Sequence, residues 1–112
     1  MDEHRADDVR NELRARRTNE WIRSSHRSFG DAGERQRYFC ECSDGDCRST
    51  ISLRSAEYEA VRADGNLFAI TRDHEDPELD ALVVEYELYA VVGKLPGMPA
   101  RMSYESDPRR RG

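Results

Sequence analysis

The sequence has 112 residues and a net charge of −5, and its hydrophobic and charged residues each amount to 37%, which fits a single small domain. No apolar run approaches the roughly 20 residues that cross a bilayer, and the start MDEHRADDVR lacks the features of a signal peptide, so we expect a cytoplasmic protein. Residues 38–100 hold 13 acidic and 5 basic residues, so a nucleic-acid contact could use only the two arginine-containing ends of the chain.

The first predicted element is a helix over residues 5–29. This stretch contains no Gly or Pro, is rich in Arg, Glu and Ala, and is followed by a glycine where a C-cap belongs. In its first half only Val9 and Leu13 share an apolar face, whereas the second half has a better apolar face that includes Ile22. We therefore expect residues 1–29 to form an N-terminal helix whose second half docks on the domain and whose first half protrudes.

The rest of the chain alternates short apolar runs with turn residues, which predicts a small antiparallel sheet with one short crossing helix. In chain order we expect strands at 38–40 and 50–53, a helix at 55–64, a strand at 67–70, and a hairpin formed by 81–86 and 89–92, with the extension of its last strand to Lys94 left open. The predicted fold class is α+β, with the long N-terminal helix followed by this sheet. Residues 30–95 are expected to form the zinc-binding domain, and the polar residues 96–112 a disordered tail.

Three cysteines, Cys40, Cys42 and Cys47, lie within eight positions. An odd number in one cluster argues against a secreted disulfide framework and favours metal or redox chemistry in a reducing compartment. On a strand, Cys40 and Cys42 point to the same face, and the Ser-Asp-Gly-Asp turn that follows can bring Cys47 back to that face. The cluster therefore predicts a metal site with three thiolate ligands, for which zinc is the expected ion. A reversible Cys42–Cys47 disulfide is the main alternative.

A tetrahedral zinc site needs a fourth ligand. His74 follows the predicted strand at 67–70, where the end of that strand can reach the neighbouring hairpin, and it is our first choice. The other candidates are His26, Asp44, Asp46 and His4. Three thiolates and one imidazole would make a closed, structural site, whereas three protein ligands with a water would indicate catalysis.

A longer pattern connects the cysteines to His74. After the third cysteine come Glu-Tyr-Glu-Ala-Val-Arg at residues 57–62, then Phe68 and His74. In this pattern the stretch from Phe39 to Lys94 resembles a group of small uncharacterised bacterial proteins, mostly from actinobacteria. The sequence departs from that group at residues 64–66, where the group has a proline-containing turn, and in its arginine-rich tail. The group has no established activity, so the resemblance implies only that His74 is a partner of the cysteines.

The function predicted from the sequence is that of a zinc-binding interaction or regulatory module with a protein partner and no membrane contact. No nucleophile–base set, glycine-rich phosphate loop or HExxH motif is present, which weakens the case for an enzyme. Three alternatives stay open: a thiol-based redox or zinc-release sensor that uses Cys42 and Cys47, a nucleic-acid accessory protein that uses the arginine-rich ends, and a small metalloenzyme with an open zinc position.

Overall fold

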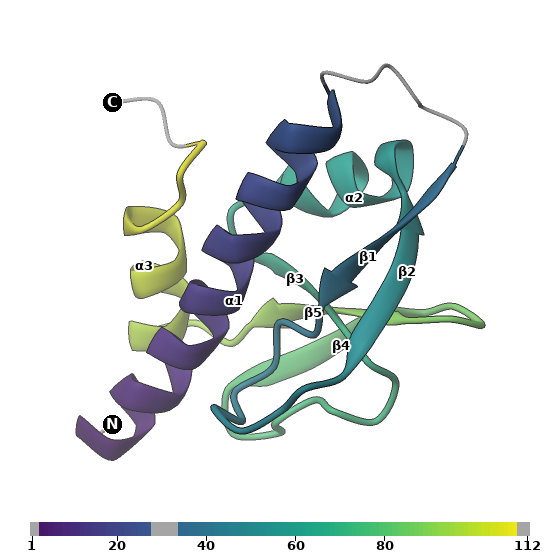
Figure 1. Ribbon diagram of the computed structural model, residues 1–112. Coiled ribbons are helices and arrows are strands. Elements are labelled where there is room, and N and C mark those ends of the chain that lie inside the picture. The colour runs from purple at the N-terminus through teal and green to yellow at the C-terminus, as the bar shows by residue number, and fades with distance from the viewer. Residues whose placement is uncertain (1–2, 28–33, 110–112) are drawn as a thin grey trace.

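The computed structural model describes residues 3–27 and 34–109, which form an α+β fold (Figure 1). Its elements in chain order are α1 (Glu3–Arg27), β1 (Arg35–Phe39), β2 (Thr50–Arg54), α2 (Ser55–Arg62), β3 (Leu67–Ile70), β4 (Asp80–Glu85), β5 (Ala90–Lys94) and α3 (Met98–Glu105). The predicted fold class is confirmed. Among the described residues, no helix is both long enough and apolar enough to cross a membrane.

The strands form two antiparallel sheets, where the sequence predicted one. β1 pairs with β2, and β5 lies between β3 and β4 in a three-stranded sheet. The pairing of β4 with β5 contains a register shift between Leu82 and Val84, so Val83 bulges from the outer strand. As a result, β4 is an edge strand with an interrupted ladder.

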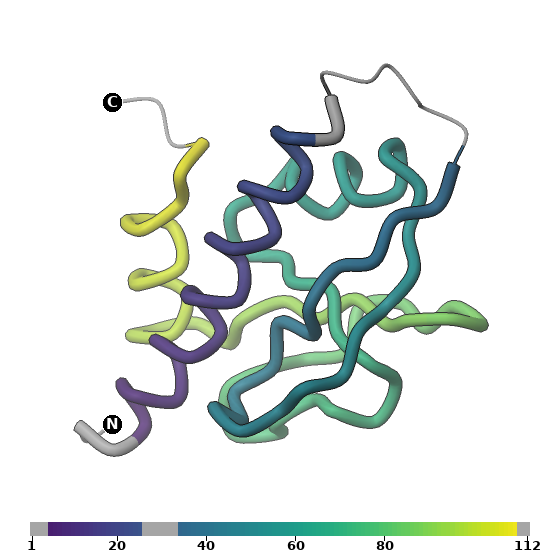
Figure 2. Tube along the Cα trace, in the orientation of Figure 1, coloured from purple at the N-terminus to yellow at the C-terminus, as the bar shows by residue number. Residues whose placement is uncertain are grey.

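In the three-stranded sheet, β3 and β5 are buried on both faces, whereas most of β4 is exposed. Successive residues of a strand point to opposite sides, so the two faces belong to different core clusters. Phe68 of β3 and Val92 of β5 belong to a core cluster that also contains Val9 and Leu13 of α1. The alternate residues, such as Ala69 and Val91, belong to a second cluster with residues of β1, β2 and α2. The sheet therefore has α3 and the first half of α1 on one side and the β1–β2 hairpin and α2 on the other, and α1 continues beyond the sheet to contact β1 (Figures 1 and 2).

The first half of α1 is docked, which corrects the prediction that it protrudes. Val9 is fully buried and Leu13 is 8% exposed, whereas Trp21 in the second half is 70% exposed. The buried face of α1 also carries Glu12, Arg16 and Asn19. Because these polar side chains interrupt the apolar periodicity, the sequence gives a weak signal for a face that is in fact buried. The last two residues of the predicted helix, 28 and 29, lie outside the described residues.

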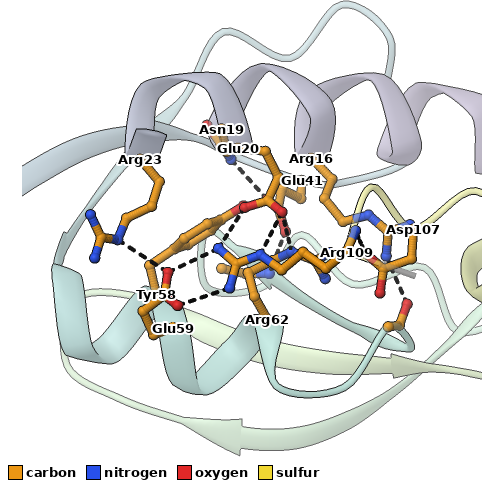
Figure 3. Close-up of polar contacts among 12 residues, drawn as sticks. Arg16, Asn19, Glu20, Arg23, Glu41, Tyr58, Glu59, Arg62, Asp107 and Arg109 are labelled. Carbon is orange, nitrogen blue, oxygen red and sulfur yellow. Dashed lines mark hydrogen bonds and ion pairs between the residues drawn. The ribbon is translucent and has the colours of Figure 1, made fainter. Parts of the chain in front are cut away.

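Residues 98–105 form the helix α3, so the prediction of a disordered tail is wrong for this segment. Met98 and Met102 pack against the core cluster of α1, and the Ser103 carbonyl accepts a hydrogen bond of 2.8 Å from Arg16. Beyond the helix, Arg109 bridges Glu20 of α1 and Glu59 of α2, with N···O distances of 2.6 and 2.8 Å (Figure 3). These polar contacts, together with the two methionines, hold the C-terminal segment against α1 and α2.

A buried ion cluster joins α1 to the three-stranded sheet. The ammonium group of Lys94 lies between the carboxylates of Glu12 and Asp80, and all three side chains are at most 1% exposed. Burial, supported by the charge of Asp80 and opposed by that of Lys94, raises the pKa of Glu12 to about 8. One proton on Glu12 makes the cluster electrically neutral, since a single ammonium then faces a single carboxylate.

This cluster predicts a pH-dependent stability. In the unfolded chain Glu12 has its ordinary pKa of 4.5 and is ionised near neutral pH, whereas the folded protein retains the proton up to about pH 8. A carboxyl group whose pKa is raised by folding stabilises the folded protein at low pH. Its contribution to the free energy of unfolding is lost as the pH rises through 8. We expect the free energy of unfolding to fall by about 2 kcal/mol between about pH 6 and pH 8 because of Glu12. Urea unfolding at saturating zinc measures the effect, and E12Q should remove it; equal pH slopes for the two proteins would contradict it.

Candidate metal centre

Cys40 and Cys42 lie just after β1, where the chain passes from one sheet to the other. The Cys40 amide donates to the Ser49 carbonyl at 3.1 Å, which prolongs the pairing of β1 with β2. The Glu41 amide instead donates to the Ala69 carbonyl of β3 at 2.9 Å. The two cysteines are buried in the core cluster on the α1 side of the sheet. The backbone at Cys40 and Glu41 is therefore hydrogen-bonded to both sheets independently of a metal.

Glu41 is completely buried between the two cysteines in sequence, and three donors converge on its carboxylate. Asn19 and the Tyr58 hydroxyl donate to Oε2, each at 2.9 Å (Figure 3), and the Ala69 amide donates to Oε1 at 2.9 Å. Burial raises the pKa of Glu41, and these hydrogen bonds oppose the rise. Glu41 thus ties the Cys-x-Cys segment to α1, α2 and β3.

Cys47 is brought back toward the other cysteines by a tight turn. The Cys47 amide donates to the Asp44 carbonyl at 3.1 Å, and the Asp44 side chain accepts from the Asp46 amide at 2.9 Å. Asn11 of α1 donates to the Ser43 carbonyl at 3.0 Å. A Cβ atom at Gly45 would lie 3.1 Å from the Asn11 amide nitrogen, so glycine permits this close approach of the turn to α1.

His74 reaches the cysteines from the loop after β3. Its amide donates to the Thr71 carbonyl at 3.1 Å, and the preceding Asp73 has a φ of 70° in a turn that reverses the chain. The Nδ1 atom of His74 is 3.5 Å from the Cys40 sulfur and 3.7 Å from the Cys47 sulfur. The nearby Thr71 amide donates to the Cys40 sulfur at 3.1 Å. The structure thus places this imidazole at the thiols, as the sequence predicted.

The four candidate ligands form one compact group. The sulfur atoms of Cys40, Cys42 and Cys47 and a ring nitrogen of His74 all lie within 4.8 Å of one another, and the group could hold a metal ion. In a tetrahedral site with metal–sulfur bonds of about 2.3 Å and metal–nitrogen bonds of about 2.0 Å, sulfur and nitrogen ligands are about 3.5 Å apart. The two sulfur–nitrogen distances match this value.

The thiols already interact in a way that favours a thiolate. The pKa of Cys40 is lowered, chiefly because the Cys42 thiol donates a hydrogen bond to its sulfur and also because the Thr71 amide does so. The pKa of Cys42 is raised for the reciprocal reason, since its proton is held by Cys40. Metals bind thiolates, so the hydrogen bonds to Cys40 favour the form of this cysteine that binds a metal. Metal binding would release the protons of the other two thiols.

Among the residues whose side chains the structure describes, the other predicted ligands, Asp44 and Asp46, are not part of this group. Asp44 and Asp46 are exposed, and the Asp44 carboxylate accepts a hydrogen bond from the Asp46 amide within the turn. The side chains of His4 and His26 lie outside those the structure describes. All three cysteines are free. The role of Glu41 was not predicted, because a glutamate between two cysteines carries no sequence signal of burial.

A cavity of about 220 Å³ opens beside the thiols. All three cysteines line it, together with Arg14 and Asn11 of α1. A site with three thiolates, a neutral imidazole and a divalent ion carries one negative charge. Arg14 is the basic residue among those that line this cavity. The sensor alternative, which requires the sulfurs to be reached by small solutes, stays a prediction.

Comparison with protein-family models, with curated proteins and with solved structures gives no match. The resemblance to the small actinobacterial proteins therefore stays a prediction, and the interpretation of the site depends on its geometry.

Proposed function

We propose that this protein binds one zinc ion through Cys40, Cys42, Cys47 and His74 as a structural site, and acts as an interaction or regulatory module. The observation that carries the proposal is the convergence of three sulfurs and one imidazole nitrogen within 4.8 Å. Thiolate-rich sets of four ligands with tetrahedral spacing favour zinc among the abundant divalent ions, since magnesium and calcium require oxygen ligands.

A structural role is supported by the origin of the ligands. Four protein ligands complete a tetrahedron, and no position then remains for a water or a substrate. The ligands come from three separate parts of the chain, which are the segment after β1, the 43–47 turn and the loop after β3. Zinc would therefore act as a cross-link between the hairpin and the three-stranded sheet, in a chain small enough for such a cross-link to matter.

Loss of the imidazole tests the assignment of the fourth ligand. We expect H74A to bind zinc roughly 100-fold more weakly than the parent, since even groups outside the ligand set change metal affinity 10–100-fold. Competition with a chromophoric chelator measures the affinity, and the cobalt-substituted protein reports through its absorption spectrum whether the site is tetrahedral. H26A is the matched control, because His26 was the second candidate. Parent-like zinc affinity in H74A, together with a loss in H26A, would reverse the assignment.

A further inference from the structure

A basic hollow lies between α1 and α3, which pack side by side (Figures 1 and 2). Its volume is about 280 Å³. Three of the described residues that line it are arginines from successive turns of α1, and none of them is acidic. The lining residues are Arg10, Leu13, Arg14, Arg17, Met102 and Ser106. We call this feature the α1–α3 hollow.

Two glutamates of α1 that could neutralise these arginines are turned away from the hollow. The side chain of Glu12 is fully buried and pairs with Lys94. The side chain of Glu20 is 13% exposed and pairs with Arg109 and Arg62 in the space between α1 and α2 (Figure 3). The helix thus places its glutamates in the interior and its arginines at the surface, which the sequence alone does not reveal.

Two of the three arginines in the hollow have no acidic partner. Arg10 forms an ion pair with Asp7, which is one turn earlier on the exposed side of α1. Within residues 3–27 and 34–109, the guanidinium groups of Arg14 and Arg17 form no ion pair and no hydrogen bond. The hollow therefore has two positive charges available to an anionic ligand.

The neighbouring elements do not cancel these two charges. Outside the hollow, α3 presents Arg101 and Glu105, which are both exposed and together add no net charge. Asp44 lines the cavity beside the thiols together with Arg14, whereas Arg17 is not among the residues that line that cavity. The positive charge is therefore least opposed at Arg17, in the middle of α1.

Trp21 continues the line of the arginines along α1. It is the only tryptophan of the chain and is 70% exposed. Residues 10, 14, 17 and 21 are separated by four, three and four positions, so their side chains lie on one face of the helix. Guanidinium groups match the geometry of phosphate, and an exposed indole ring offers a flat surface on which a nucleic-acid base can stack.

This combination favours single-stranded nucleic acid over other anionic partners. A lipid surface requires an apolar helix face, and the apolar residues Val9 and Leu13 of α1 are buried on the sheet. An acidic protein segment would pair with the arginines but would leave the indole of Trp21 without a planar partner. A single strand supplies a phosphate and an unstacked base in each nucleotide, whereas the bases of a duplex are already stacked on one another.

We propose that the exposed face of α1 binds single-stranded nucleic acid, with a phosphate group held by Arg14 and Arg17 in the α1–α3 hollow and a neighbouring base stacked on Trp21. The proposal goes beyond the function proposed above, because the hollow contains none of the four metal ligands. Residues 38–100 carry 13 acidic and 5 basic residues, which repel the remainder of a strand. We therefore expect a short site with modest affinity that depends strongly on salt.

The test titrates the zinc-loaded full chain with a labelled single-stranded DNA of about ten nucleotides at low ionic strength. Anisotropy of the label measures affinity, and the fluorescence of Trp21 reports stacking. We expect the strand to quench Trp21, and W21A and R14A/R17A each to weaken binding about tenfold or more. In R14A/R17A the slope of log affinity against log salt should also fall by about 1.4, which is about 0.7 for each lost phosphate contact.

R37A/R54A is the matched control, because it removes the same charge from two exposed positions of the β1–β2 hairpin. We expect this control to bind within about twofold of the parent, since long-range charge effects are small compared with direct phosphate contacts.

Four outcomes would overturn the proposal. The first is no binding of the strand at low ionic strength, and the second is an equal loss in R14A/R17A and R37A/R54A, which would indicate a general effect of net charge. The third is a duplex of the same sequence that binds as tightly as the single strand. The fourth is polyglutamate or anionic vesicles that bind as tightly as the strand, which would assign this face to an acidic protein segment or to a membrane surface.

Discussion

Replacement of Cys40 by serine is expected to abolish zinc binding and to leave the protein largely unfolded at 37 °C. Zinc sites of this ligand class contribute on the order of 10 kcal/mol to folding, and the total stability of a small domain is about 5–15 kcal/mol. The Cys40 sulfur accepts a hydrogen bond from the Thr71 amide and lies 3.5 Å from the Nδ1 atom of His74, so Cys40 links the segment after β1 to the loop after β3. A serine hydroxyl at this position is a poor zinc ligand and leaves the other thiolates close together without a cation.

Native mass spectrometry and thermal melts followed by circular dichroism measure this effect. The parent is expected to carry one zinc ion and to lose its cooperative melt when a strong chelator is added, in the same way as C40S. D46N is the control, because Asp46 is exposed in the same turn and lies outside the ligand group. A parent protein that melts at the same temperature with and without chelator would contradict the structural role of the metal, even if zinc were bound.

The sequence predicted the local features of the fold and the members of the candidate site. The strand at 67–70 and the final hairpin of β4 and β5 were found because short apolar runs bounded by turn residues are local signals. The cysteines and His74 were found because thiols at short spacing are rare outside metal or redox sites and because zinc requires a fourth ligand. Only the choice of His74 over the other candidates also used an expectation about packing, namely that the end of the 67–70 strand lies near the cysteine hairpin.

The features that were missed depend on polar contacts between distant residues. Arg16 of α1 is buried because it donates to the carbonyls of Gly65 and Ser103, and Arg109 is held by glutamates of α1 and α2. Such residues look like solvent-exposed charges in a sequence, since Arg and Glu are rarely buried without specific partners. The first half of α1 was therefore predicted to protrude, and the segment that forms α3 was predicted to be disordered. The division of the strands into two sheets also depends on long-range pairing that the sequence leaves open.

Glu41 shows the same limit within the candidate site. It lies between two predicted ligands, and its alternation with them was visible in the sequence, but nothing there distinguished a buried carboxylate from an exposed one. In the structure it receives hydrogen bonds from α1, α2 and β3. Because Cys40 and Cys42 project to the other side of the same short segment, the anchoring of Glu41 also sets the positions of both sulfurs.

Truncation of Glu41 is therefore expected to damage both stability and metal binding. E41A leaves the Tyr58 hydroxyl and the Ala69 amide without their acceptor and opens a cavity, so we expect a loss of about 3–5 kcal/mol in the free energy of unfolding. The remaining folded protein should bind zinc more weakly, because the Cys-x-Cys segment is no longer held against β3. Urea unfolding with excess zinc and chelator competition measure the two effects separately.

Two control variants separate the anchoring of the segment from a general loss of charge. Y58F removes one of the three donors to Glu41 and is expected to cost only about 1 kcal/mol, with little change in zinc affinity, since the Asn19 and Ala69 bonds remain. E85A removes an exposed carboxylate that pairs with Arg72 and should change stability by less than about 1 kcal/mol.

If E41A reduced stability but bound zinc as tightly as the parent, Glu41 would support the core without positioning the ligands. If zinc binding were weaker in E41A but not in Y58F or E85A, the geometry of the metal site would depend on a carboxylate that does not touch the metal.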